Sequence, residues 1–104
     1  MPKRKVKDVK GGCIIDERKK KVLRRLMAIE GQVKGLQKMI EKDRYCVDIL
    51  TQISSTHEAL RGVAKIMMRN FLETCATNAI QSKNITKQEE IYNELMDVIY
   101  KFAK

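Results

Sequence analysis

The sequence predicts an all-α protein whose protomer has three helices, the central one unusually long. Proline occurs only at Pro2, and Leu, Met, Lys, Arg and Glu, which favour helices, are abundant. Apolar residues recur at alternating intervals of three and four, a spacing typical of helices that pack along a seam. A monomer of 104 residues buries little surface, so we expect an oligomer.

The first helix is expected to begin at Asp16, which separates a flexible basic arm (residues 1–15) from a helical domain (residues 16–104). Asp16 suits the N-cap, because its carboxylate accepts hydrogen bonds from free N–H groups of the first turn. The helix should run to about Glu41. Its expected seam consists of Val22, Leu26, Ile29, Val33, Leu36 and Ile40.

The second helix is expected to have Asp43 as its cap and to run without a break to about Ile80 or Gln81. Such a helix is too long to be covered by its own chain. Its expected seam consists of Cys46, Leu50, Ile53, His57, Leu60, Ala64, Met67, Phe71 and Cys75. After a polar connector, Thr86 is the expected cap of a short third helix. The apolar positions of that helix are Ile91, Leu95, Val98 or Ile99, and Phe102.

Positive charge is concentrated in the first half of the chain. Residues 1–45 hold 15 Lys and Arg against 6 Asp and Glu, whereas residues 46–104 hold 7 of each kind. An excess of this kind favours a polyanionic partner, most simply nucleic acid. A solvated basic tail is the alternative, but it does not explain the lysines and arginines of the first helix.

Other classes of protein fit the sequence less well. No apolar run is long enough to cross a membrane, and no signal peptide follows the basic start, so we expect a cytoplasmic protein without a membrane partner. A membrane-surface protein would need a stripe of apolar residues facing lipid, and a copper buffer would not need the basic first half. An enzyme is not expected, because the nucleophile candidates lack a paired base.

Three cysteines stand at Cys13, Cys46 and Cys75. An odd number in a chain without secretory features argues against a framework of structural disulfides and for metal binding or redox chemistry. Cys46 lies in the first turn of its helix beside Arg44, and both features stabilise a thiolate, although Asp48 partly opposes them. Cys46 is therefore the expected nucleophile and Cys75 its resolving partner. The alternative is that both are small apolar residues of the seam.

The two helical thiols are expected to meet only between subunits. Along a regular helix, Cys46 and Cys75 are separated by about 43 Å at about 1.5 Å per residue, whereas a disulfide needs Cα atoms within about 7 Å. Steps of about 100° nevertheless place both thiols within about 20° of each other around the helix. An antiparallel dimer with its two-fold axis near Leu60 and Arg61 would therefore bring each Cys46 beside a Cys75 of the other chain.

Two stretches of the chain resemble a known family of regulators. They are "RLMAIEGQVKGLQKMIEKDRYCVDILTQIS" and "NFLETCATNAI", the latter followed by "YNELMDVIYKF". The chain from Lys20 onward is similar to the copper-sensing operon repressor family, the CsoR/RcnR-type repressors. This resemblance implies an all-α dimer of dimers, a homotetramer that binds operator DNA without a helix-turn-helix. It also implies that an effector bound between subunits releases the DNA.

One residue departs from the copper sensors of that family. They place a histidine four residues before the second cysteine, where this chain has Phe71, which cannot bind a metal. The resemblance is therefore nearest to the CstR-like branch, which senses reactive sulfur species and needs no cofactor. It implies that the reduced protein represses and that Cys46 takes up sulfur from a persulfide or polysulfide. Cys75 of the partner subunit then closes a bridge of two or more sulfurs.

Copper is the alternative effector. Cu(I) is a soft ion that accepts two thiolates, so Cys46 and Cys75 could bind it without the histidine. Cys13 could add a third thiolate, although a cysteine on a flexible arm is more often incidental. Zinc would want four ligands, which the sequence does not show. The natural inducer, the operator and the regulated genes cannot be read from the sequence.

The resemblance also assigns residues around the site and at the DNA surface. Tyr45 and Glu94 match positions beside the metal in family members, and Phe71 would line the site, although packing and surface roles fit these residues as well. His57 is expected to be partly buried and bonded to a neighbour. Basic residues matching or adjoining the family's DNA surface are Lys19, Lys20, Lys21, Arg24, Arg25 and Arg61.

Overall fold

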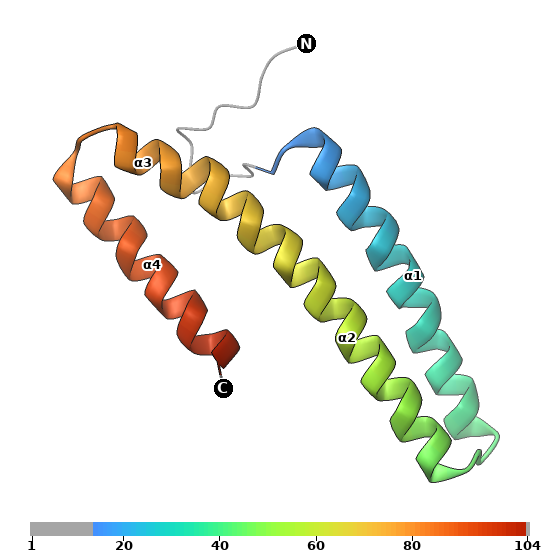
Figure 1. The fold of residues 1–104 in the computed structure, drawn as a ribbon. Coiled ribbons are helices and arrows are strands. Elements are labelled where there is room, and N and C mark those ends of the chain that lie inside the picture. The colour runs from blue at the N-terminus through green and yellow to red at the C-terminus, as the bar shows by residue number, and fades with distance from the viewer. Residues whose placement is uncertain (1–13, 104) are drawn as a thin grey trace. The chain divides into compact units, whose positions relative to one another are not determined.

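The computed structural model describes residues 14–103, and every element among them is helical. The elements are α1 (Asp16–Glu41), α2 (Cys46–Phe71), the π-helical turn η1 (Leu72–Ala76), α3 (Thr77–Gln81) and α4 (Ile85–Ala103) (Figure 1). Since α2, η1 and α3 follow one another without a gap, the chain forms three helical stretches with a long central one. The predicted fold class is confirmed. Most of the predicted arm, including Cys13, lies outside the described residues.

The chain divides into two compact units. One unit, Asp16–Met67, contains α1 and most of α2, joined by a short turn. The other contains Met68–Lys104 together with the residues before α1, so it holds the end of α2, η1, α3 and α4. Cys46 belongs to the first unit and Cys75 to the second. No described helix is long and apolar enough to cross a membrane.

The turn after α1 ends that helix rather than capping α2, so the expected role of Asp43 is wrong. Asp43 has a left-handed backbone conformation (φ 53°). Its N–H donates to the Ile40 carbonyl at 3.1 Å, and the Arg44 N–H donates to the Met39 carbonyl at 3.0 Å. This pair of bonds is a Schellman motif, which satisfies carbonyls at the end of a helix. The first bond of α2 is accepted instead by the Tyr45 carbonyl, from Ile49.

The connector before α4 corrects a second expected cap. The side-chain oxygen of Asn84 accepts a hydrogen bond from the Lys87 N–H at 3.2 Å, and the Asn84 carbonyl accepts one from the Gln88 N–H at 3.0 Å. Asn84 is therefore the N-cap of α4, and the expected cap Thr86 lies inside the helix. One residue earlier, Lys83 takes the left-handed conformation (φ 60°) that follows the end of α3.

Helix α2 buries one stripe of residues within this chain, and the predicted seam is a different stripe that is exposed from Cys46 to Met67 apart from the half-buried Ala64. The buried residues are Thr56, Val63 and Asn70, spaced seven apart as one face of a helix requires. By contrast, the seam residues Leu50 and Leu60 keep 63% and 47% of their surface exposed. The other large exposed side chains of that seam are Ile53 and Met67. The predicted seam of α1 is mixed, with Val22 and Ile29 buried and Leu26, Val33 and Ile40 exposed.

A π-helical turn interrupts the α-helix that was expected to be unbroken up to Gln81. It spans Leu72–Ala76 and includes Cys75. Threonine hydroxyls bind carbonyls on both sides of the turn: Thr77 Oγ1 donates to Leu72 at 2.8 Å, and Thr74 Oγ1 donates to Asn70 at 2.7 Å. Such side-chain bonds to backbone carbonyls are a recognised cause of local departures from α-helical geometry. The regular 100° step that aligned the two thiols therefore does not hold over these last residues.

Candidate functional site

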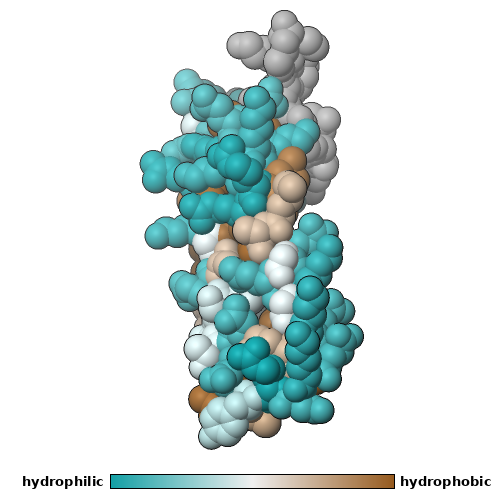
Figure 2. All heavy atoms as spheres, turned by 90° about the vertical axis from the view of Figure 1, so that its right-hand side faces the viewer, coloured by the Kyte–Doolittle hydropathy of each residue, from teal (hydrophilic) through white to brown (hydrophobic). Residues whose placement is uncertain are grey.

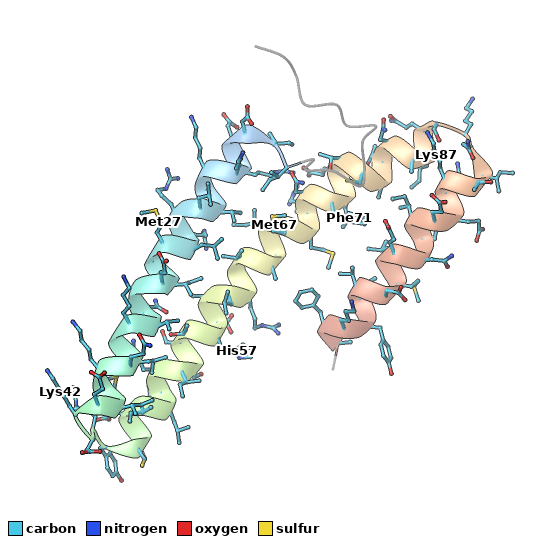
Figure 3. All side chains as sticks on the ribbon, turned by 180° about the vertical axis from the view of Figure 1, so that it is seen from behind. Met27, Lys42, His57, Met67, Phe71 and Lys87 are labelled. Carbon is cyan, nitrogen blue, oxygen red and sulfur yellow. The ribbon has the colours of Figure 1, made fainter. Side chains whose placement is uncertain are left out.

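Cys75 is at the centre of the small core of its unit. It is 1% exposed and forms a buried cluster with Ala76, Ala79 and Ile91, against which Phe71 packs (Figure 3). Small side chains at three of these positions let η1 and α3 contact α4 closely. The thiol itself lies 3.6 Å from Thr74 Oγ1. The Cys75 thiol is therefore held in a mostly apolar setting with the Thr74 hydroxyl beside it.

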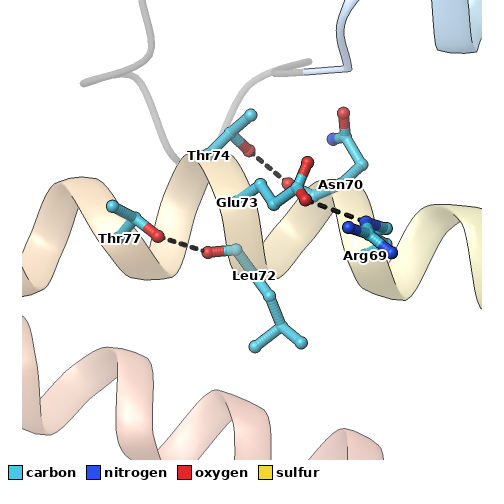
Figure 4. A network of polar contacts seen from close by, with 6 residues as sticks. All are labelled: Arg69, Asn70, Leu72, Glu73, Thr74 and Thr77. Carbon is cyan, nitrogen blue, oxygen red and sulfur yellow. Dashed lines mark hydrogen bonds and ion pairs between the residues drawn. The ribbon is translucent and has the colours of Figure 1, made fainter.

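A polar network runs along the turn that contains Cys75. Asn70, which is 2% exposed, accepts a hydrogen bond from the Ile15 N–H through its side-chain oxygen at 3.2 Å. Its carbonyl accepts a hydrogen bond from the Thr74 hydroxyl (Figure 4). The same Thr74 oxygen lies next to the Cys75 sulfur. The buried Asn70 thus ties the residue before α1 to the segment that carries the thiol. Apolar periodicity provides no signal for this role, because a buried Asn interrupts the pattern.

Cys46 has the opposite surroundings. It is the first residue of α2 and its side chain is exposed, as is that of Tyr45 before it. Cys46 is thus exposed on its own chain, whereas Cys75 is held among the side chains of its own unit.

The described residues of one chain do not form a metal site with three or more ligands. Among the described residues, no group of three or more His, Cys, Asp or Glu side chains gathers around a common point. The two thiols are soft donors of the kind that Cu(I) prefers. Phe71 brings a hydrocarbon ring to the Cys75 cluster and adds no donor. The residues present fit a two-coordinate soft ion and do not fit zinc, which takes four ligands.

Two other predicted residues are placed by the structure. Glu94 is half-buried on α4, in the same unit as Cys75. His57 is exposed in the single chain (Figure 3). It lies on the stripe of α2 that a partner subunit is expected to cover, so the expectation of a partly buried, bonded histidine stays a prediction.

Basic side chains cover the outer surface of α1. Lys19, Lys20, Lys21, Arg24 and Arg25 are all exposed. Figure 2, in which this side faces the viewer, shows a largely hydrophilic face with scattered apolar residues. Arg61 is exposed on α2, where its Nε lies 3.9 Å from Glu58 Oε1. The six residues predicted to contact DNA are thus all available to solvent within one unit.

The structure places the side chain of one of these arginines against a glycine of α2 that was not among the predicted residues. A Cβ atom placed on Gly62 would lie 3.4 Å from Nη1 of Arg25. The guanidinium of Arg25, on α1, therefore lies against α2 at the position next to Arg61. A lone glycine inside a helix was the available signal, because such a residue usually has a packing or functional reason.

The family model for metal-sensitive transcriptional repressors matches this chain over residues 18–101. The chain belongs to that family. Metal-sensitive transcriptional repressors are regulators and not enzymes, which confirms the expectation from the sequence. The match includes both thiols and every residue predicted to contact DNA.

Relatives of this repressor are named as copper sensors. The copper-sensing transcriptional repressor CsoR of Bacillus subtilis (strain 168) is 44% identical over 86 residues, which are 83% of this chain and 82% of that protein. The copper-sensing transcriptional repressor RicR of Mycobacterium tuberculosis is 45% identical over 64 residues, which are 62% of this chain and 67% of that protein. A crystal structure of CsoR with Cu(I) from Geobacillus thermodenitrificans NG80-2 superposes with a TM-score of 0.78. It is 43% identical and the match covers 86% of this chain and 91% of that one.

These relatives correct the expectation that no cofactor is involved. They are named as copper-sensing, and the solved structure contains Cu(I). Membership of the CsoR/RcnR family is confirmed, but these relatives are named as copper-sensing repressors and not as persulfide sensors. The expectation was wrong because it gave one position, Phe71, more weight than the similarity of the rest of the chain.

Proposed function

We propose that this protein is a Cu(I)-responsive repressor of transcription, in which Cys46 and Cys75 of a partner subunit hold the ion. The observation that carries the proposal is the pair of free thiols in a chain 44% identical to a copper-sensing repressor. Thiolate sulfur is the softest ligand that a protein offers, and Cu(I) is a soft ion. The structural relative that contains Cu(I) supports the same choice of metal.

The exposed stripe of α2 supports an assembly of subunits. Leu50, Ile53, Leu60 and Met67 form a line of apolar side chains that their own chain leaves in solvent. Large exposed apolar surfaces of this kind mark contacts with other molecules. We expect two copies to pair antiparallel along this stripe and two such dimers to form a tetramer. Cys46 lies at one end of the stripe, where it can meet Cys75 of the partner subunit.

Each residue of the proposed site has a distinct task. When bound, Cu(I) would supply a link between the two thiolates that needs no third donor. Phe71 packs against the cluster around Cys75 and keeps that side of the site apolar. The Thr74 hydroxyl, 3.6 Å from the Cys75 sulfur, orients that thiol. Cys46, being exposed, is the thiol that the ion can reach from solvent.

DNA binding is assigned to the basic surface of α1 together with Arg61. Lysine and arginine side chains bind phosphates and so set affinity and register more than sequence preference. We propose that the apo protein represses and that the ion, by linking two subunits, favours an arrangement that fits DNA less well. The free energy of coupling between effector and DNA is expected to be about 1–3 kcal/mol.

Replacement of a single thiol tests this function. Reduced full-length protein is titrated with Cu(I) while its binding to a duplex selected from a random-sequence library is followed by fluorescence anisotropy. Wild type should lose affinity by about 5- to 150-fold. Cys46→Ala should bind the same duplex equally well and keep that affinity when Cu(I) is added, because one thiolate remains per site. A Cu(I) response that survives in Cys46→Ala would contradict the site.

Sensing of reactive sulfur species is the second candidate, and Phe71 is the observation that favours it. Without a third donor beside Cys75, the two thiols are also suited to covalent chemistry. The Cys46 thiolate would attack a sulfane sulfur of a polysulfide and expel the shortened polysulfide. Cys75 of the partner subunit would then attack the Cys46 sulfur and expel hydrosulfide, so that the sulfane sulfur is reduced as the disulfide forms.

Exposure to polysulfide separates the two candidates. Intact-protein mass spectrometry should show whether polysulfide joins two chains. The DNA affinity of the same samples is measured by fluorescence anisotropy. If polysulfide joins the chains and abolishes DNA binding while Cu(I) leaves it unchanged, the copper proposal is wrong and the second candidate holds. If Cu(I) releases the DNA and polysulfide does not, the copper proposal is supported.

A further inference from the structure

We propose that the hydrogen bond between Asn70 and Ile15 couples the Cys75 thiol to the start of the basic helix α1. The inference rests on the proposed function and adds to it the route by which the effector lowers DNA affinity. The bond joins the side-chain oxygen of Asn70 to the Ile15 N–H at 3.2 Å. It is intact in the form that binds DNA, and occupation of the site at Cys75 breaks it.

Ile15 is the residue at which the chain passes from one compact unit to the other. It belongs to the unit that contains Cys75, and Asp16, the next residue, begins both α1 and the other unit. Lysines and arginines lie on both sides of this point in the sequence, with 5 in residues 1–15 and 6 in residues 16–25. A contact that holds the Ile15 backbone therefore holds the point from which both basic segments extend.

Asn70 also contacts the turn that carries the thiol. Its carbonyl accepts a hydrogen bond from the Thr74 hydroxyl at 2.7 Å (Figure 4). The Thr74 oxygen lies 3.6 Å from the Cys75 sulfur. Asn70 and Thr74 are 2% and 7% exposed, so water cannot readily replace the bond between them. These contacts form a continuous path from the thiol to the Ile15 N–H.

The Cys75 thiol has to move before it can share an effector with a partner subunit. It is 1% exposed in the single chain, whereas Cys46 is exposed. A ligand held by both thiols therefore requires a movement of η1 that brings the Cys75 sulfur to the surface. Thr74 moves with its neighbour, which strains its bond to the Asn70 carbonyl and then the bond from Asn70 to Ile15. A π-helical turn, a feature frequent at functional sites, is a suitable place for such a movement.

A purely structural role for Asn70 leads to a different expectation. If Asn70 only stabilised the fold, its replacement would weaken the binding of DNA and of Cu(I) together, because both need the folded protein. A coupling bond favours the form that binds DNA and opposes the form that binds the ion. Its removal should therefore lower the DNA affinity of the apo protein and raise the Cu(I) affinity of the protein without DNA.

Two variants remove the bond from its opposite ends. Asn70→Leu replaces the acceptor with an apolar side chain of similar size. Ile15→Pro removes the donor N–H just before a helix, where proline is tolerated, and it remains a test if Asn70→Leu does not fold. Ile15→Ala is the control for the proline variant, because it keeps the N–H. Thr56→Val is the control for the leucine variant, since Thr56 is a buried polar residue of α2 that bonds only to the Gln52 carbonyl of its own helix.

The experiment measures the DNA affinity of full-length reduced protein with and without Cu(I), and its Cu(I) affinity without DNA. Fluorescence anisotropy on the selected duplex gives the first two, and competition with a Cu(I) chelator gives the third. Asn70→Leu and Ile15→Pro should each lower apo DNA affinity and raise Cu(I) affinity by about 2- to 10-fold, the effect of one hydrogen bond. The double variant should change them no further. Ile15→Ala and Thr56→Val should keep the wild-type ratio of DNA affinities.

Amide hydrogen exchange follows the bond itself. In wild type the Ile15 N–H should exchange slowly without Cu(I) and faster once the ion is bound, because the bond protects it only in the apo form. In Asn70→Leu the exchange should be fast in both forms. Fast exchange in the apo wild type, or exchange that stays slow after Cu(I) has released the DNA, would overturn the proposal.

The outcomes distinguish this inference from the proposal beneath it. If Cu(I) leaves the DNA affinity of wild type unchanged, the proposed copper response is wrong, whatever the variants do. If wild type responds and both bond-removing variants respond as strongly, the coupling through Asn70 is wrong and the copper response stands. If both variants lose DNA affinity and Cu(I) affinity together, Asn70 has a structural role and does not couple the two sites.

Discussion

At the scale of single residues, the candidate sensor depends on two thiols in unlike surroundings. Cys46 is exposed at the start of α2, whereas Cys75 is buried in the core of the other unit. Phe71 packs against the cluster around Cys75. The copper sensors of the family that this chain resembles have a histidine at that position. Among the described residues the candidate site therefore has two soft donors, and its apolar neighbour Phe71 adds no third ligand.

Restoring a donor at position 71 tests this interpretation. Phe71→His should add an imidazole nitrogen to the two sulfurs, and we expect Cu(I) affinity to rise by about tenfold or more. Competition with a Cu(I) chelator measures the affinity, and X-ray absorption counts the ligands. Leu72→His is the matched control, because Leu72 is exposed and is not part of the cluster. A coordination number that stays at two in Phe71→His would show that position 71 does not face the ion.

At the scale of elements, helix ends and one irregular turn arrange the site. Asp43 ends α1 in a left-handed conformation, and Asn84 caps α4. The cap matters for the sensor because α4 supplies Ile91, the large aliphatic member of the cluster around Cys75. Between these points, η1 places Cys75 on a turn with π-helical hydrogen bonds that Thr77 helps to satisfy.

Loss of the α4 cap should loosen this unit. Asn84→Ala removes the side-chain acceptor of the Lys87 N–H and should lower the free energy of unfolding by about 1 kcal/mol. Thr86→Ala should change it by less than about half as much, because Thr86 lies inside the helix and is not the cap. Urea unfolding of the apo protein, followed by circular dichroism, measures both. Equal effects would show that the cap is misassigned.

At the scale of the whole molecule, the chain exposes both an apolar stripe and a basic surface. The stripe along α2 remains in solvent in a single chain, and the excess positive charge lies in the first 45 residues. A transcriptional repressor of this family needs contacts with other subunits and with DNA, and these two surfaces are suited to those tasks. The antiparallel dimer and its tetramer stay predictions.

A charge placed within the stripe tests the assembly. Leu60→Glu should weaken association, because two like charges would face each other near the expected two-fold axis. Sedimentation velocity over a range of concentrations should show dissociation at concentrations at which wild type stays assembled. Ser55→Glu is the control, since Ser55 is exposed on the same helix but outside both stripes. Association that is unaffected by Leu60→Glu would place the interface elsewhere.

The family was predicted correctly from the sequence, whereas the expected absence of a cofactor was wrong and the site residues stay predictions. Both thiols and the basic positions could be proposed because cysteine, lysine and arginine carry their chemistry wherever they are placed. Asn70 and Thr74 were missed, because their roles depend on contacts that the apolar pattern does not encode. The preference for sulfur over copper gave too much weight to the missing histidine, because its absence does not prevent two thiolates from binding Cu(I).

The sequence alone determined that the chain forms three helical stretches, because periodicity, helix-forming composition and the absence of internal proline act locally. It also determined the uneven charge, which is a property of composition. Tertiary structure decided which apolar stripe of α2 is buried, since a periodic pattern identifies an apolar face but not the surface that covers it. It also decided where α2 departs from α-helical geometry and which residues cap the helices, because those outcomes depend on hydrogen bonds made in the folded chain.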